Sequence, residues 1–195
     1  PDQMPYKNPM GQTYDTGQVE KVMDQGLALA DWQGFDGRAA QSKANGKLRG
    51  LGIATFLEWT GGNVFEERVT VTVLGDGTIE VFSAVNQMGQ GIATTLAQLV
   101  VDAFGVPLDR VRVVLGDTDR GDGFGSAGSR SIFTGGSAMQ VGSQRTIEHA
   151  KTLAAQELEA AADDIGYAAG EFKVKGTDVG ISLFALAAKQ PEGRI

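Results

Sequence analysis

Two glycine-rich stretches, each between a predicted strand and a predicted helix, constrain this chain more than any other feature of its sequence. The first glycine loop comprises residues 86–91, and the second glycine loop comprises residues 121–131. Glycine is used where the backbone must turn sharply or approach a ligand closely. A helix N-terminus presents unpaired N–H groups and a partial positive charge. Both junctions therefore favour an anionic ligand, above all a phosphate.

The pattern of apolar residues around these loops predicts the strands. Valines alternate with threonines over residues 69–73, a Gly-Asp-Gly turn follows, and residues 79–85 return, which is typical of a β-hairpin. This hairpin ends at the first glycine loop. Residues 111–115 predict a further short strand, residues 172–175 predict the last one, and residues 51–59 predict a buried strand.

Apolar residues at helical spacing predict four helices, at residues 15–32, 96–104, 134–162 and 183–188. Asp15 followed by Gln18 predicts the cap of the first helix, and Ser182 predicts the cap of the last one. Residues 34–46 predict a polar connection. Together the elements predict an α+β fold, with a mixed or mostly antiparallel sheet and helices packed on one side.

We expect three parts along the chain. Residues 1–48 hold an extended segment, a helix and a connection, residues 49–166 form the α+β core, and residues 167–195 form a strand–helix piece. The chain begins at Pro1 without a methionine, so we interpret it as an internal fragment whose last part is truncated. We expect a cytoplasmic parent protein, with a periplasmic one left open because the native N-terminus is missing.

The composition excludes several functional classes. The chain has no cysteine and one histidine, which excludes disulfides, iron–sulfur ligands and a thiolate or multi-histidine metal site within it. Its net charge is −7 and it has no lysine–arginine stripe, so a nucleic-acid partner is not expected. No apolar run approaches the roughly 20 residues that span a bilayer. We expect neither a protein-bound metal nor a membrane partner.

The two loops offer a ligand different groups. Gln90 supplies two donors and an acceptor, which suits the edge of a heterocycle. The second glycine loop combines serine hydroxyls, backbone amides and the guanidinium of Arg130, which is the chemistry of a phosphate cradle. It matches neither Gly-Lys-Ser/Thr nor the dinucleotide pattern G-x-G-x-x-G. The chemistry alone leaves open a simple helix-capping turn at the first loop and a flexible solvent loop at the second.

The order of several short motifs favours a ligand-binding interpretation. They are, in sequence, Met88-Gly89-Gln90-Gly91, Gln98-Leu99-Val100, Gly105-Val106-Pro107-Leu108, the run VRVVLGDT at 111–118, and Gly128-Ser129-Arg130-Ser131. This series resembles the molybdopterin-binding region of the molybdenum hydroxylase family, which includes xanthine dehydrogenases, aldehyde oxidases and aerobic carbon monoxide dehydrogenases. The resemblance covers most of the chain and weakens after about Gly166.

The resemblance implies a large subunit that hydroxylates an aldehyde or an N-heterocycle, or oxidises carbon monoxide, with water as the oxygen source. The implied cofactor is molybdenum–molybdopterin, in its plain or dinucleotide form, and this piece would form one wall of the cofactor site. The residues implied to contact it are Gly89, Gln90, Gly91, Ser126, Gly128, Ser129, Arg130 and Ser131. The active-site loop of the family precedes this region and its catalytic glutamate follows it, so the catalytic residues here are unknown.

The resemblance also implies partners: the remainder of the large subunit, iron–sulfur and flavin subunits or domains, and a small-molecule substrate. We expect the isolated fragment to be inactive and to bind the cofactor weakly, because the facing walls are missing. Two alternatives stay open, a non-catalytic interaction domain and a binder of another phosphorylated ligand. Glu58 is interpreted as a structural or solvent residue, with a functional role as the alternative.

Overall fold

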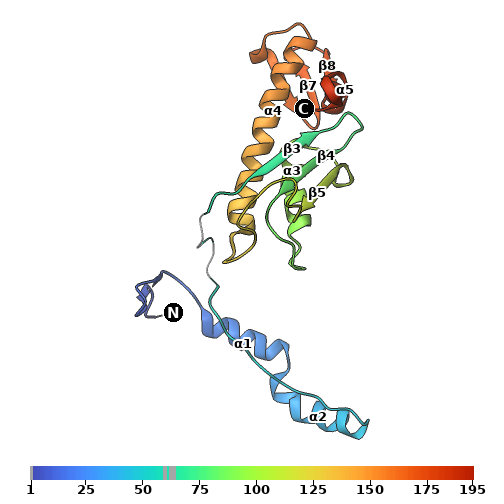
Figure 1. Cartoon of the computed structure of the whole chain (residues 1–195). Helices are drawn as coiled ribbons and strands as arrows, with labels where there is room; N and C mark the ends of the chain where they lie inside the picture. The colour runs from blue at the N-terminus through green and yellow to red at the C-terminus, as the bar shows by residue number, and fades with distance from the viewer. Residues whose placement is uncertain (1, 59–60, 62–64) are drawn as a thin grey trace. The chain divides into compact units, whose positions relative to one another are not determined.

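The computed structural model describes residues 2–58, 61 and 65–195, and the chain divides into two compact units (Figure 1). Unit 1 is Pro1–Leu57 and unit 2 is Glu58–Ile195. Helices and small sheets make up the chain, which confirms the predicted α+β class. The three-part division predicted at residues 48 and 166 stays a prediction.

Unit 1 contains a small antiparallel sheet and short helices. Its elements are β1 (Tyr6–Lys7), β2 (Thr13–Tyr14), α1 (Val19–Leu29), η1 (Trp32–Gly34) and α2 (Phe35–Ala44). The predicted first helix is present as α1, but the Asp15 cap is wrong. Gln18 occupies the N-cap position, and Asp15 accepts a hydrogen bond from the N–H of Thr16.

Two further predictions for unit 1 are wrong. Residues 34–46 contain the whole of α2 instead of a polar connection, because their alanine, arginine, glutamine and lysine residues are good helix formers. Residues 51–58 have no regular secondary structure and are exposed, and residue 59 lies outside the described residues. A strand needs a neighbour to pair its N–H and C=O groups. No described segment pairs with residues 51–58.

Unit 2 is built on a three-stranded mixed sheet in the order β3-β4-β5. The predicted hairpin is confirmed as β3 (Val69–Val73) paired antiparallel with β4 (Ile79–Ser83). The predicted strand β5 (Val111–Leu115) lies parallel to β4. Helix α3 (Ile92–Phe104) connects these two parallel strands.

Helices α3 and α4 (Ser137–Glu157) pack against each other and against the sheet, α4 along β3 and α3 along β5 (Figure 1). A π-helical turn, η3 (Ser131–Gly136), leads into α4. The buried core joins strand, helix and C-terminal residues, among them Val73, Val81, Leu96, Val100, Phe104, Met139, Phe172 and Leu186. Within the described residues, no helix is both long and apolar enough to cross a membrane.

The C-terminal part adds a second antiparallel sheet to the same unit. The sheet comprises β6 (Ile165–Ala168), β7 (Glu171–Val174) and β8 (Gly180–Ser182), and α5 (Leu183–Lys189) follows it. The 3-10 turns η4 (Ala162–Asp164) and η5 (Pro191–Gly193) lie before and after these elements, and a third, η2 (Leu108–Arg110), precedes β5. The predicted cap is confirmed, since Ser182 Oγ accepts a hydrogen bond from the N–H of Ala185 over 3.2 Å.

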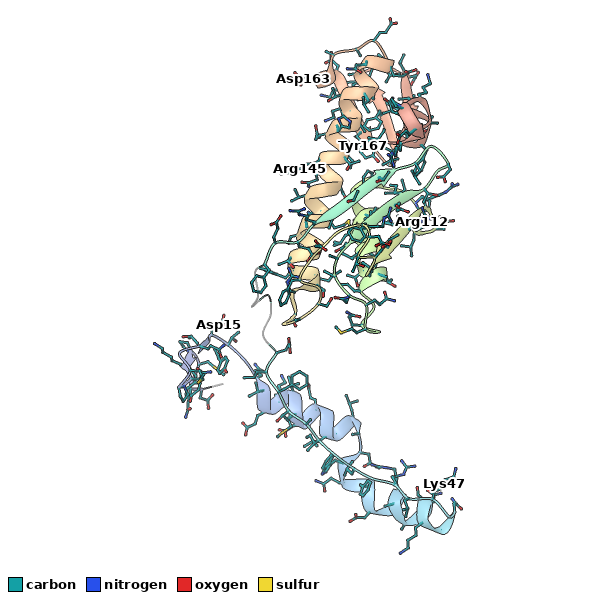
Figure 2. The ribbon with its side chains drawn as sticks, in the orientation of Figure 1. Asp15, Lys47, Arg112, Arg145, Asp163 and Tyr167 are labelled. Atoms are coloured by element: carbon teal, nitrogen blue, oxygen red, sulfur yellow. The ribbon has the colours of Figure 1, made fainter. Side chains whose placement is uncertain are left out.

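The C-terminal sheet meets the end of α3 at Tyr167, which Figure 2 labels. The Tyr167 hydroxyl donates to the carbonyl oxygen of Phe104 over 2.8 Å. Burial raises the pKa of Tyr167 to about 12. Beside this contact, a Cβ on Gly105 would lie 2.7 Å from the Cα of Ala169, so the two backbones are in close contact. The end of α3 is thereby fixed, while its beginning faces the glycine loops.

Candidate functional site

Both glycine loops leave the carboxyl ends of neighbouring parallel strands. The first glycine loop follows β4 and leads into α3, and the second follows β5 and leads into η3. The carboxyl ends of parallel strands meet at one edge of a sheet, which is where open α/β sheets bind ligands. The parallel pairing of β4 with β5 therefore brings the two loops to the same edge.

Asn86 and Ser126 join the two loops directly. The N–H of Asn86 donates to Ser126 Oγ over 2.9 Å, and Ser126 Oγ donates to the Asn86 carbonyl over 2.8 Å. The N–H of Ser126 donates to Asn86 Oδ1 over 3.3 Å, and Ser131 Oγ donates to Ser126 Oγ over 2.6 Å. A Cβ on Gly125 would meet Asn86 Oδ1 at 2.2 Å, so a side chain at this position would displace the Asn86 amide. We call this arrangement the Asn86–Ser126 clasp.

Gln90 uses part of its amide to close the first glycine loop on itself. Its Oε1 accepts from the N–H of Met88 over 2.6 Å, and its Nε2 donates to the Asn86 carbonyl over 2.9 Å. An amide has two donor hydrogens and two acceptor lone pairs, so one of each is left for a ligand. The loop shape thus depends on the same residue that was predicted to contact the ligand.

The two glycines of the first loop border open space. Gly89 and Gly91 have φ angles of +88° and +79°, in the left-handed region that favours glycine. A Cβ on either residue would meet nothing within 4 Å. Gly91 is also the N-cap of α3, and no side chain of the described structure caps this helix. The N–H groups of the first turn of α3 are therefore available to a ligand.

The second glycine loop presents its predicted hydroxyl groups at different depths. Ser129 is exposed, has a φ of +53°, and donates from Oγ to Glu58 Oε1 over 2.9 Å. Gly128 and Ser131 are half-buried, and Gly128 also has a positive φ. Glu58, which the sequence left as a structural or solvent residue, therefore contacts a predicted site residue.

Arg130 is not on the exposed surface of its loop. Its side chain is 0% exposed and that of Glu67 is 2% exposed, and their Nη1 and Oε2 atoms are 2.9 Å apart. Nη1 also donates to the carbonyl of Gly125 over 2.6 Å, and Nη2 donates to that of Phe65 over 3.0 Å. The sequence predicts a guanidinium that contacts the ligand, whereas these nitrogen atoms contact protein oxygen atoms.

Two residues that organise the loops, Asn86 and Glu67, were not predicted from the sequence. A polar amide directly after a buried strand was the available signal for Asn86. Glu67 lies in the run Glu66-Glu67-Arg68, which has the composition of a solvated surface segment. Its partner Arg130 lies 63 positions further along the chain, so no local pattern could predict the pair.

The donor set of the loops suits an oxyanion and the edge of a heterocycle more than a bare metal ion. It consists of backbone N–H groups, serine hydroxyls and side-chain amides. Among the described residues, no group of three or more His, Cys, Asp or Glu side chains is arranged to hold a metal. A metal here would need to arrive on a ligand of its own.

Comparison with known proteins identifies the class. A family model described as the molybdopterin cofactor-binding domain matches residues 25–194. The chain belongs to this family, and the resemblance to molybdenum hydroxylases inferred from its sequence is confirmed.

The chain matches a part of each of several longer proteins. The gamma subunit of the 6-hydroxypseudooxynicotine dehydrogenase complex of Paenarthrobacter nicotinovorans is 35% identical over 90% of this chain and 22% of the relative. The carbon monoxide dehydrogenase large chain of Afipia carboxidovorans is 30% identical over 90% of this chain and 24% of the relative. The crystal structure of quinoline 2-oxidoreductase from Pseudomonas putida 86 aligns with a TM-score of 0.61 and 29% identity, over 97% of this chain and 26% of that chain. The chain thus spans about a quarter of their length.

Proposed function

We propose that this chain forms one wall of the molybdopterin site in the large subunit of a molybdenum hydroxylase. The Asn86–Ser126 clasp carries the proposal, because it unites in one hydrogen-bonded cluster the two loops that supply every proposed contact. The proposed contacts are Gly89, Gln90 and Gly91 from the first loop and Ser126, Gly128, Ser129 and Ser131 from the second, with Arg130 supporting them from behind.

The available groups fit the parts of this cofactor. N–H groups at the start of α3 and the serine hydroxyls of the second loop suit the phosphate, or the diphosphate of a dinucleotide form. The remaining donor and acceptor of Gln90 suit the edge of the pterin. Open space beside Gly89 and Gly91 leaves room for a ligand against the backbone. The cofactor supplies two-electron oxidation chemistry when bound, and the chain supplies position and polar contacts.

The names of the relatives support a finer functional assignment. Nicotine and quinoline, in the names of two related proteins, are N-heterocycles. We therefore propose hydroxylation of an N-heterocycle or aldehyde carbon for the parent enzyme, with carbon monoxide oxidation as the alternative. Iron–sulfur and flavin components would receive the electrons. The isolated chain would be inactive and bind the cofactor weakly, because it spans only about a quarter of the relatives.

The test uses the full-length protein that contains this chain. Gln90→Ala and Ser126→Ala should lower the content of molybdenum and of fluorescent oxidised pterin about tenfold, because each removes hydrogen bonds that shape or line the site. Gln98→Ala, at an exposed position of α3, and Ser137→Ala, at the exposed start of α4, are matched controls and should retain wild-type content. Nucleotide released on denaturation would identify the dinucleotide form.

Two results would overturn this proposal. Wild-type pterin content in both loop variants would favour an interaction domain whose glycine loops are simple turns. A phosphorylated compound without pterin or molybdenum, lost in the same variants, would favour a binder of another ligand.

A further inference from the structure

The buried ion pair between Arg130 and Glu67 is an unusual way to fill this part of the molecule. Both side chains are almost completely removed from solvent. Removing two charges from water is costly, and apolar residues of similar volume often give equal or greater stability. The pair is therefore poorly explained as a device for stability alone, and its contacts indicate another role.

Arg130 connects two stretches of the chain through three acceptor groups. It bonds to Glu67 and the carbonyl of Phe65 in the segment before β3, and to the carbonyl of Gly125 in the second glycine loop. Its guanidinium also lies 5.3 Å from the ring centroid of Phe124, and the Phe124 ring lies 4.6 Å from that of Phe65. A guanidinium is a rigid planar fork with five donors, so it can hold several acceptors at fixed angles, which a lysine cannot do.

The residues held by Arg130 are the immediate neighbours of the proposed cofactor contacts. Gly125 precedes Ser126 of the Asn86–Ser126 clasp, and Arg130 itself lies between Ser129 and Ser131. Glu67 Oε1 is 3.5 Å from Ser83 Oγ, at the end of β4 from which the first glycine loop departs. Displacement of the guanidinium would therefore release the second loop at Gly125 and at Arg130 itself.

We propose that Arg130 and Glu67 are positioning residues that hold the second glycine loop in its binding conformation before the cofactor arrives. This inference rests on the proposed function, since it assigns a binding role to that loop. Arg130 acts through the backbone of the loop, and the neutral N–H and hydroxyl groups contact the ligand. Ordering the loop during folding lowers the entropy cost of binding.

Two variants of the full-length protein test the pair. Arg130→Lys keeps the charge beside Glu67 but cannot reach all the oxygen atoms that Arg130 bonds. The double variant Glu67→Leu/Arg130→Met replaces both charges with apolar side chains of similar size, and should retain a near-wild-type melting temperature. Arg145→Met, at the exposed arginine labelled on α4 in Figure 2, is the control.

Two quantities are measured: hydrogen exchange of residues 121–131 in cofactor-free protein, and molybdenum and pterin content after expression with the cofactor. Both test variants should show exchange in the second loop at least about tenfold faster and a correspondingly lower cofactor content, while the control matches wild type. If the pair served stability alone, a double variant with a wild-type melting temperature would also show wild-type exchange in the second loop and wild-type cofactor content.

The outcomes separate this inference from the proposed function. Wild-type exchange and cofactor content in Arg130→Lys would overturn the inference, and would leave the proposed function intact if Gln90→Ala still lost cofactor. Wild-type cofactor content in the double variant would overturn it equally. Faster loop exchange without loss of cofactor in any loop variant, Gln90→Ala included, would overturn the proposed function and with it the binding role assigned to the pair.

Discussion

Replacing Gly105 with alanine should destabilise the protein more than the same replacement at Gly91, although the two residues cap opposite ends of α3. Both have positive φ angles, +66° at Gly105 and +79° at Gly91. A Cβ on Gly91 would meet nothing within 4 Å. A Cβ on Gly105 would lie 2.7 Å from the Cα and 3.2 Å from the backbone N of Ala169. Backbone atoms cannot move aside as the end of a side chain can.

The magnitudes follow from these two costs. The left-handed conformation costs an alanine about 1–2 kcal/mol at either position. Overpacking against Ala169 adds about 1–3 kcal/mol at Gly105. The free energy of unfolding should therefore fall by about 2–5 kcal/mol in Gly105→Ala and by about 1–2 kcal/mol in Gly91→Ala.

Thermal unfolding of the 195-residue chain, followed by far-ultraviolet circular dichroism, measures the difference. The melting temperature of Gly105→Ala should lie about 2–12 °C below that of Gly91→Ala. The comparison cancels the conformational cost that both variants share, so it isolates the packing of α3 on the turn between β6 and β7. Equal melting temperatures would refute that packing.

Three further changes have defined outcomes. Tyr167→Phe removes the bond to the Phe104 carbonyl and should cost about 1 kcal/mol in urea titrations at pH 7. The pKa of Tyr167 is raised to about 12 from an ordinary 10.0, so between these pH values the tyrosine ionises only in the unfolded chain and the free energy of unfolding of the wild type falls. The variant should lack this fall, and equal slopes of the free energy of unfolding against pH would contradict the raised pKa. Gly125→Ala should displace Asn86 Oδ1 and speed amide exchange in both glycine loops; unchanged exchange would mean that the clasp tolerates a Cβ there. Gly89→Ala should lower cofactor content in the full-length protein, because its methyl group enters the open space; full content would show that no ligand occupies that space.

Local sequence patterns predicted the elements that need no distant partner. The alternating valines and the Gly-Asp-Gly turn specify a hairpin through neighbouring residues alone, and β3 and β4 follow that pattern. Ser182 caps α5 as expected, because a cap bond spans only three residues. The order of strand, first glycine loop and helix was also correct, although β4 ends at Ser83 and α3 begins at Ile92, earlier than the predicted residues 85 and 96.

The wrong predictions concern segments whose structure depends on distant residues or on a small difference between helix and coil propensity. Residues 51–58 have the apolar composition of a strand, yet a strand exists only when another segment pairs with it, and none does so among the described residues. The polarity of residues 34–46 predicts a connection, although a largely exposed helix such as α2 needs good helix formers more than a broad apolar face. The parallel pairing of β4 with β5, which brings the loops together, has no signature in either strand alone.

The burial of the Arg130 and Glu67 charges explains why the residue types in the loops did not predict which groups face the ligand. A phosphate is commonly met by arginine or lysine, and the sequence offered Arg130 for that purpose. In the structure its charge is balanced by Glu67 behind the loop, and the groups proposed to contact the ligand are neutral dipoles. Neutral dipoles bind an anion well only when they are fixed in direction before it arrives, because each must replace a water molecule that is free to turn. The glycine motifs therefore mark where a ligand can lie, while a pair of residues 63 positions apart decides whether the donors point toward it.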